Sequence, residues 1–251
     1  MKNWPKWLKW TLGIVGGLIT IGGLALWLNS DPLPEGKQGP AADALAEKMM
    51  KAVNKPAWDS TTYVQWTFKG MHTFLWDKER HLTIVEWKNN KVILDINNIS
   101  GKAWKDGNEL PAEQAKPIVK KAWEYWCNDA FWLNAPVKAF DGGTERRLVE
   151  MEDGSEALLI TYKSGGVTPG DSYLWILDEK GLPKEWRMWV SIIPMGGVTF
   201  SWEKWTDLTT GAKIATFHDS KMIDLDISNL KGSRQLSDFG YEQDPFQVIV
   251  P

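Results

Sequence analysis

The sequence predicts a mainly β protein with some α-helix. The predicted architecture is an antiparallel, half-open β-barrel of about eleven strands, capped by two helices and preceded by one N-terminal transmembrane helix. Three observations predict it: short β-branched and aromatic runs separated by turn residues, two stretches with amphipathic helical spacing, and one long uncharged apolar stretch near the N-terminus.

The first strands are expected between residues 63 and 96. Four runs there are rich in β-branched and aromatic residues, and polar turn residues separate them, which predicts consecutive hairpins. The first run alternates, but the next two carry apolar residues on both faces. Because an antiparallel sheet with one solvated face alternates apolar and polar residues, both faces of this sheet must be covered. The four runs are 63–68, 71–76, 82–87 and 92–96.

Residues 1–30 are expected to form a cytoplasmic stub and a transmembrane anchor. Thr11–Leu28 holds no charge over 18 residues, and such a helix would be roughly 27 Å long, enough to cross the hydrocarbon core. Three lysines precede the run and Asp31 follows it. The positive-inside rule then predicts a single-pass membrane protein with a cytoplasmic amino terminus and its body outside. A cleaved signal peptide is the alternative, and it exports the body as well.

Behind the anchor, residues 31–40 form a linker by composition, residues 41–228 a single domain, and residues 229–251 a C-terminal tail or an edge strand. Apolar residues spaced by four predict a helix over Ala41–Asn54. A second helix is expected up to Cys127, with Pro117 at its first position after a separate helical turn from Pro111. Its apolar side would lie across the concave side of the sheet.

The chain then returns to strands, and the turn clusters between them are evenly spaced. That spacing favours one barrel or sandwich over β-α-β units. Several of these strands are again apolar on both faces. The expected strands are 131–133, 147–151, 157–162, 173–177, 185–192, 198–205, 213–218 and 222–227.

The composition excludes several classes of function. Outside the first 30 residues the chain carries 26 basic and 32 acidic residues, and an acidic body argues against a nucleic-acid partner. No HxH, HExxH or CxxC spacing occurs, and His72 and His81 would lie roughly 16 Å apart along a hairpin. No GxSxG sequence is present. We therefore expect no metal, no cofactor and no catalytic residue, and a protein that is not an enzyme.

Tryptophan is the unusual component, with 17 residues in 251. Interiors pack close to 0.75 density, so this many rings on a curved sheet predict a cavity, a groove or lipid contact. Filling of an ordinary core is the alternative for each single ring. The predicted apolar ligand site comprises Trp66, Phe68, Phe74, Trp76, Trp87, Trp123, Trp126, Trp175, Trp189 and Trp202.

The order of elements resembles the periplasmic lipoprotein-carrier superfamily, with its LolA/LolB-like fold. A helix (41–54) precedes the first strand Tyr63-Val64-Gln65-Trp66-Thr67-Phe68, and a helical insertion and further antiparallel strands follow. The hairpin 174–183, which ends Asp178-Glu179-Lys180-Gly181-Leu182-Pro183, is similar to one common in that family. The chain is similar in particular to uncharacterised, membrane-anchored bacterial members, and this resemblance implies a single-pass protein of the bacterial inner membrane with a periplasmic body. The resemblance implies a half-open barrel that shelters acyl chains, although a tethered chain is unable to shuttle between membranes.

These observations predict a membrane-tethered, extracytoplasmic protein that binds a lipid or another hydrophobic ligand without catalysis. Two alternatives stay open. An anchored protein–protein interaction module of the envelope would have a filled barrel and Trp exposed outside. An enzyme would have a cleft in which His72, His81 or His218 meets a carboxylate.

Overall fold

The computed structural model describes residues 30–250. The predicted anchor Thr11–Leu28 and the cytoplasmic stub lie outside the described residues. Between Ser30 and Val250, no helix combines the length and the apolar character that a membrane crossing requires.

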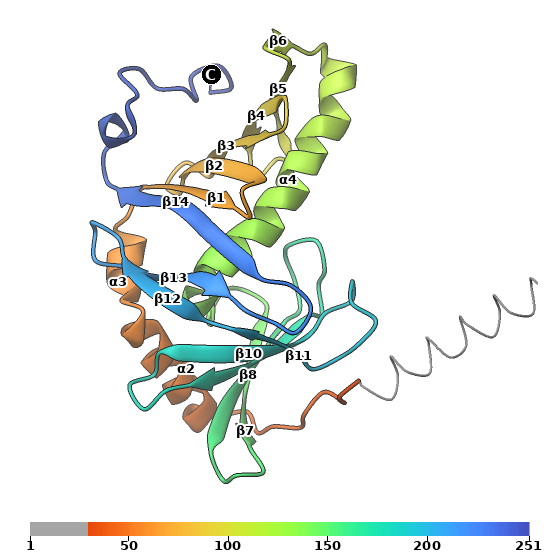
Figure 1. Ribbon diagram of the computed structural model, residues 1–251, viewed down its shortest axis with the longest axis vertical. Helices are drawn as coiled ribbons and strands as arrows, with labels where there is room; N and C mark the ends of the chain where they lie inside the picture. The colour runs from red at the N-terminus through yellow and green to blue at the C-terminus, as the bar shows by residue number, and fades with distance from the viewer. Residues whose placement is uncertain (1–29, 251) are drawn as a thin grey trace, which may run out of the picture.

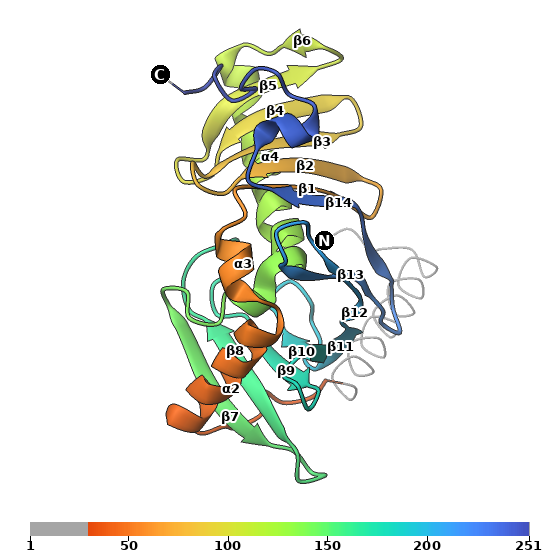
Figure 2. The same cartoon turned by 90° about the vertical axis from the view of Figure 1, so that its left-hand side faces the viewer.

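Two open antiparallel sheets make up the molecule, and the longer one has nine strands (Figures 1 and 2). Its two edge strands are β12 and β6, and β14 near the C-terminus pairs with β1. In spatial order the strands are β12 (Glu203–Asp207), β13 (Lys213–His218), β14 (Leu225–Ser233), β1 (Tyr63–Phe68), β2 (His72–Asp77), β3 (Leu82–Trp87), β4 (Asn90–Asp95), β5 (Ser100–Lys105) and β6 (Asn108–Glu109).

The second sheet has five strands and is built from the middle of the chain. Neighbours in this sheet are also neighbours in sequence, so it is a simple meander. In spatial order it contains β11 (Val198–Ser201), β10 (Pro183–Trp189), β9 (Ser172–Leu177), β8 (Glu156–Tyr162) and β7 (Thr144–Glu150).

The prediction of a mainly β fold with antiparallel strands is confirmed, but the single half-barrel of about eleven strands is wrong. Residues 30–250 form fourteen strands in two sheets that do not close. The run 198–205, predicted as one strand, is divided at Trp202 between β11 and β12. Trp202 donates its backbone N–H to Lys184 O at 2.7 Å. The chain thus leaves the short sheet and enters the long one without a turn.

Two helices flank the first strand and the short sheet. Helix α2 (Pro40–Ala52) matches the predicted 41–54, and it packs Ala46 and Met49 into the core. Asn54 adopts a left-handed conformation (φ 56°), and a short helix, α3 (Lys55–Asp59), follows it. The Asn54 side-chain amide donates to Gly211 O at 2.8 Å, which ties this bend to the β12–β13 turn.

Helix α4 (Ala112–Asn134) differs from the prediction at both ends. It is continuous through Pro117, whose place in the second turn removes a single helical hydrogen bond, the one to Glu113 O. It also includes residues 131–133, which were predicted to be a strand. Trp132 and Leu133 are buried against the core there, so the helical face continues to that end. A helix of this length runs along the molecule and contacts both ends of the long sheet (Figure 2).

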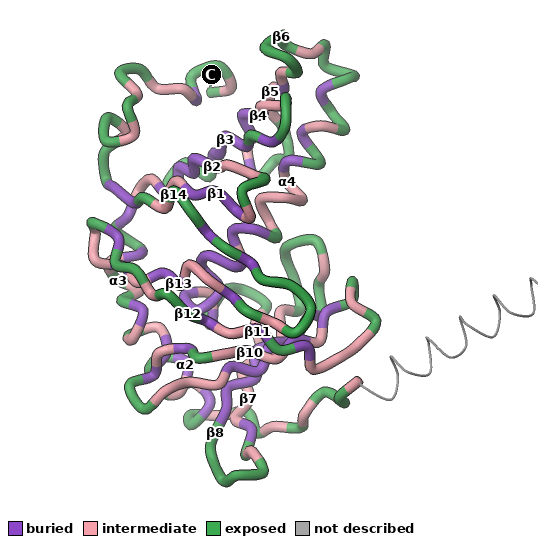
Figure 3. The backbone as a smooth tube through the Cα atoms, in the orientation of Figure 1, coloured by how far each residue is buried: buried purple, intermediate pink, exposed green. Residues whose placement is uncertain are grey.

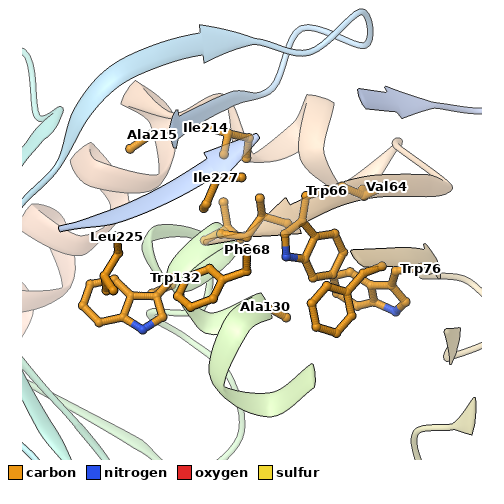
Figure 4. Close-up of a cluster of buried hydrophobic side chains, with 14 of the residues drawn as sticks. Val64, Trp66, Phe68, Trp76, Ala130, Trp132, Ile214, Ala215, Leu225 and Ile227 are labelled. Carbon is orange, nitrogen blue, oxygen red and sulfur yellow. The ribbon is translucent and has the colours of Figure 1, made fainter. Parts of the chain in front are cut away.

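The main core lies on the inner face of the long sheet and between the two sheets. Figure 4 shows Ala130 and Trp132 of α4 beside Trp66, Phe68 and Trp76 of the first strands and Ile214, Leu225 and Ile227 of the last ones. In Figure 3 the buried residues, coloured purple, lie along the same strands and on the side of α4 that faces them. Aromatic rings therefore connect the covering helix with strands from both halves of the chain.

The outer face of β2–β4 is covered by the C-terminal segment, residues 234–250. Strand β14 ends at Ser233, and the chain then crosses this face with one 3₁₀ turn, Leu236–Phe239. The side chain of Phe246 is fully buried there. The covered strand residues are Leu75, Leu82, Ile84 and Ile93. The C-terminal residues thus begin as a strand and continue as an irregular cover.

The predicted linker, residues 31–40, lies against the short sheet. Lys37 exchanges both backbone hydrogen bonds with Leu148, at 2.9 and 2.8 Å. A Cβ atom added at Gly36 would lie 2.9 Å from Arg147 Cβ, so only glycine allows this close approach. Residues 30–39 therefore belong to the packed body.

Candidate functional site

Five of the ten predicted ligand-site rings line the inner, concave face of the long sheet. The residues from β1–β3 are all buried: Trp66, Phe68, Phe74, Trp76 and Trp87. Trp66 stacks on Phe74 with 4.5 Å between ring centroids. The alternation of these side chains with outward-facing residues explains why they share one face.

Helix α4 brings Trp123 and Trp126 onto the same surface. Trp126 meets Trp76 edge-on, with 5.3 Å between centroids. Trp123 is half-buried and packs against the same core. The predicted position of this helix over the sheet is therefore confirmed, and the two layers are in direct contact at Trp126.

A second aromatic group lies between the two sheets. Trp175 and Trp202, both predicted, pack 5.0 Å apart. Trp186 and Trp132 join them, with 4.8 Å between their centroids. Neither was among the predicted site residues. Trp186 could have been identified from the sequence, because it lies two positions from Met188 and therefore on the same face of the strand. Trp132 was missed because a strand was predicted over residues 131–133.

Trp189 was predicted to belong to the ligand site, but the fold places it apart from the other predicted rings. It lies on the opposite face of the short sheet, beside Leu174 and Met151. Its indole N–H donates to Asp31 O at 2.8 Å. This ring fixes the start of the described chain and does not face the concave surface.

Several polar atoms inside the aromatic core have no hydrogen-bond partner among residues 30–250. Six indole N–H groups are in this position, together with Asn134 Oδ1, Tyr162 Oη and His218 Nε2. Buried donors in folded proteins nearly always have an acceptor, and an unpaired one costs about 1–3 kcal/mol. The six indoles belong to Trp66, Trp76, Trp126, Trp175, Trp186 and Trp202.

His72 and Asp129 form a polar contact between the sheet and α4. His72 Nδ1 donates to Asp129 Oδ2 at 2.7 Å, and the Asp129 side chain is only 2% exposed. The ring of Tyr125 stacks on the imidazole at 3.9 Å. Asn128 donates to the second oxygen of Asp129 at 2.8 Å. The enzyme alternative expects His72, His81 or His218 beside a carboxylate, but no sequence pattern identified Asp129 as the partner, because it is 57 positions from His72 and on a different element.

The other histidines and the cysteine lie in different surroundings. His218 is fully buried beside Trp202, and desolvation lowers its pKa to about 4. Its Nδ1–H donates to Ser201 O at 3.0 Å. Burial raises the pKa of the Cys127 thiol to about 12. Within 30–250, no three His, Cys, Asp or Glu side chains gather in a way that could hold a metal ion.

A hollow of about 330 Å³ lies away from the aromatic core. It is on the outer side of β4 and β5, and its walls include Lys91, Ile93 and Trp104. A smaller space of about 10 Å³ lies near Trp58 and Leu133. Neither hollow is lined by a residue of the predicted ligand site.

Comparisons with known proteins leave the family open. No family model matches the chain, and no curated protein matches it. Among solved structures, a DUF1329 family protein from Desulfovibrio piger ATCC 29098 is similar, with 11% identity and a TM-score of 0.39. The match covers 80% of this chain and 97% of that chain. A TM-score this low carries no argument about function, and the LolA/LolB-like resemblance stays a prediction.

Proposed function

We propose that this protein is a membrane-tethered, extracytoplasmic binder of a lipid or another apolar ligand, and that the ligand occupies the surface between α4 and the concave aromatic face. The observation that carries the proposal is the layer of aromatic rings between α4 and β1–β3, in which the buried indole N–H donors of Trp66, Trp76 and Trp126 have no acceptor among the described residues.

The unpaired donors suggest the chemistry of the ligand. At about 1–3 kcal/mol each, they make the closed arrangement of α4 costly. A hydrocarbon chain that carries ester or carboxyl oxygens would meet apolar ring surface and supply acceptors to these donors. Acylated lipids combine these two features, and the LolA/LolB-like resemblance points to the same class.

Helix α4 is suited to act as a movable cover. In the first half of the helix the buried residues are Ala115, Val119 and Ala122, whereas the large buried residues Trp132 and Leu133 lie in its last turn. Small side chains bury little area, so each contributes little to the free energy that holds the helix down. The His72–Asp129 hydrogen bond is a localised tie on the same surface. Lifting α4 would expose the rings of β1–β3 without any change in the sheet.

The experiment is a lipid-binding assay on residues 30–251. Bound lipid is extracted and identified by mass spectrometry, and Trp fluorescence is titrated with acyl probes that carry an ester group. We expect copurified lipid and saturable quenching. A protein that remains free of lipid and whose fluorescence ignores the probes would refute the proposal.

A matched pair of variants tests the role of the indole donors. Trp66→Phe removes one unpaired N–H of the proposed site but keeps an aromatic ring, whereas Trp189→Phe removes a donor that already has an acceptor, Asp31 O. We expect weaker probe binding for Trp66→Phe and unchanged binding for Trp189→Phe. Equal affinities in both variants would exclude the indole donors from recognition.

The interaction-module alternative shares one expectation with this arrangement, a filled interior. It also requires Trp on the outside. The large apolar side chains exposed between residues 30 and 250 include Ile192, Met222 and Met71, but no Trp. The aromatic surface is therefore internal in the described part of the chain, which favours ligand binding over this alternative.

The His72–Asp129 pair favours a second candidate function, hydrolysis of an acyl ester. A buried carboxylate that accepts a hydrogen bond from Nδ1 orients a histidine so that Nε2 can serve as a general base. In this reading His72 would activate a water molecule. Release of p-nitrophenol from acyl esters, abolished in His72→Gln, would support it, and equal rates in both proteins would refute it.

A further inference from the structure

The β10–β11 loop, residues 190–197, is an exposed apolar segment. It contains no charged residue, and Ile192 is 71% exposed, more than any other large apolar side chain of the described residues. Ile193 and Met195 on either side of Pro194 are partly buried against the core. The base of the loop thus packs against the core, and one apolar side chain, Ile192, projects into solvent.

This loop holds the first described residues of the chain. Asp31 donates its backbone N–H to Gly196 O at 3.1 Å, and Gly196 N–H donates to Ser30 Oγ at 2.9 Å. A Cβ atom at Gly196 would lie 2.6 Å from Asp31 O, so the two segments pack backbone to backbone. The chain therefore leaves the body at this loop.

The uncharged run Thr11–Leu28 ends two residues before Ser30. Two extended residues span at most about 7 Å. If this run crosses a bilayer, the membrane surface must lie within roughly that distance of Ser30, and therefore beside the β10–β11 loop. The position of residue 30 thus identifies the side of the body that faces the membrane.

A second exposed apolar pair lies on the same side. Met222 and Ile223, in the β13–β14 loop, are 67% and 46% exposed. This loop begins beside the end of β11, where Ser201 and Asp219 exchange hydrogen bonds. Both views place it on the side of the molecule where the described chain begins (Figures 1 and 2).

We propose that the β10–β11 and β13–β14 loops form a membrane-contact surface whose partner is a phospholipid bilayer, with Ile192 and Met222 inserted at the headgroup boundary. The proposal rests on the tether in the proposed function. Exposed apolar side chains beside the origin of an anchor fit an interfacial position. Lys221, next to Met222, can contact lipid phosphate, while Asp219 and Asp224 favour a surface with little negative charge.

The test uses the full chain in phosphatidylcholine nanodiscs. Cys127→Ser removes the native thiol, and Ile192→Cys or Met222→Cys then carries a bimane fluorophore. The control is a cysteine at Val248, which is 48% exposed on the C-terminal segment at the other end of the molecule. Spin-labelled lipid serves as the quencher. We expect loss of bimane fluorescence at Ile192 and Met222, but not at Val248.

Carbonate washing of membranes separates this proposal from the tether itself. A chain that stays in the membrane pellet but shows equal, weak quenching at positions 192, 222 and 248 overturns the contact surface and leaves the tether intact. Release by carbonate together with an absence of quenching overturns both. Hydrogen exchange of residues 190–197, slower in nanodiscs than in detergent, supports the surface without any substitution.

Discussion

The two faces of strands β1–β4 are covered in different ways, although their sequences impose the same requirement. The inner face is covered by a regular helix, α4, through aromatic contacts and the single His72–Asp129 hydrogen bond. The outer face is covered by residues 234–250, which are largely irregular. Both covers remove apolar strand residues from water, so the hydrophobic effect alone does not distinguish them.

Their attachments do distinguish them. Arg80 binds both oxygens of Asp244 at 2.6 and 3.1 Å and also holds Asp77 at 2.7 Å, so the outer cover is pinned by a forked ion pair. Paired guanidinium–carboxylate geometry resists sliding better than a single hydrogen bond. The inner cover is a helix whose large buried residues, Trp132 and Leu133, lie in its last turn, and one hydrogen bond from His72 to Asp129 joins it to β2. We infer that the outer cover is a fixed wall and that the inner cover is the part that opens.

The largest expected effect comes from the outer cover. Phe246→Ala removes a fully buried ring that packs on Leu75 and Ile84, and the loss of ring burial plus the cavity should lower the free energy of unfolding by about 3–5 kcal/mol. Urea denaturation measures it. Val248→Ala, at a 48% exposed position, is the control and should change stability little. Equal effects at the two sites would contradict a fixed wall.

Acid should destabilise the region beneath α4 through His218. Its pKa is about 4 in the folded protein and about 6.5 when unfolded. Between these values the unfolded chain binds more protons, so stability falls as pH drops from about 6.5 to about 4, by up to about 3 kcal/mol. His218→Gln should remove this part of the pH dependence, and His81→Gln, on an exposed turn, should not. Parallel pH curves for His218→Gln and the parent would refute the assignment.

Asp129→Asn tests the hydrogen bond that holds α4, the inner cover, to the sheet. Loss of the charged hydrogen bond to His72 should cost about 2 kcal/mol, within the range for charge-assisted bonds. If α4 opens to admit a ligand, the same variant should bind acyl probes faster in stopped-flow fluorescence. A variant that is less stable but binds at the parental rate would mean that α4 does not limit access.

The smallest effect is expected from Arg80→Lys. Lysine keeps the charge but loses the fork that binds Asp244 and Asp77, and a loss of about 1 kcal/mol is expected because Arg80 is about one-third exposed. Hydrogen exchange in residues 236–249 should rise while that of α4 stays constant. Faster exchange in α4 would show that the two covers are coupled.

Much of the local structure could be predicted from the sequence. The runs 63–68, 82–87 and 213–218 are strands with the predicted limits, because β-branched and aromatic residues between turn residues leave few other solutions. The lack of alternation in β2 and β3 correctly required cover on both faces. The identity of each cover is a tertiary property, so the periodicity of these strands held no signal for Phe246 or α4.

The remaining errors share a cause. The sequence predicts a strand over residues 131–133, but three consecutive apolar residues fit a strand or a helix equally well. In the structure their packing against the core favours the helix. The run 198–205 is divided between two sheets because each half pairs with a different neighbouring strand. His72 and Asp129 come together only through the placement of α4. Contacts distant in sequence decided each of these points.

The pairing of β14 with β1 in the long sheet has a consequence for synthesis. Tyr63 of β1 pairs with Ser233 of β14, and Phe246 arrives later still. Until those residues emerge from the ribosome, the first hairpins present apolar strands and an open edge to their surroundings. Such non-local pairing is slow and prone to aggregation. The nascent chain should therefore depend on a chaperone that shields residues 63–96 until translation has nearly finished.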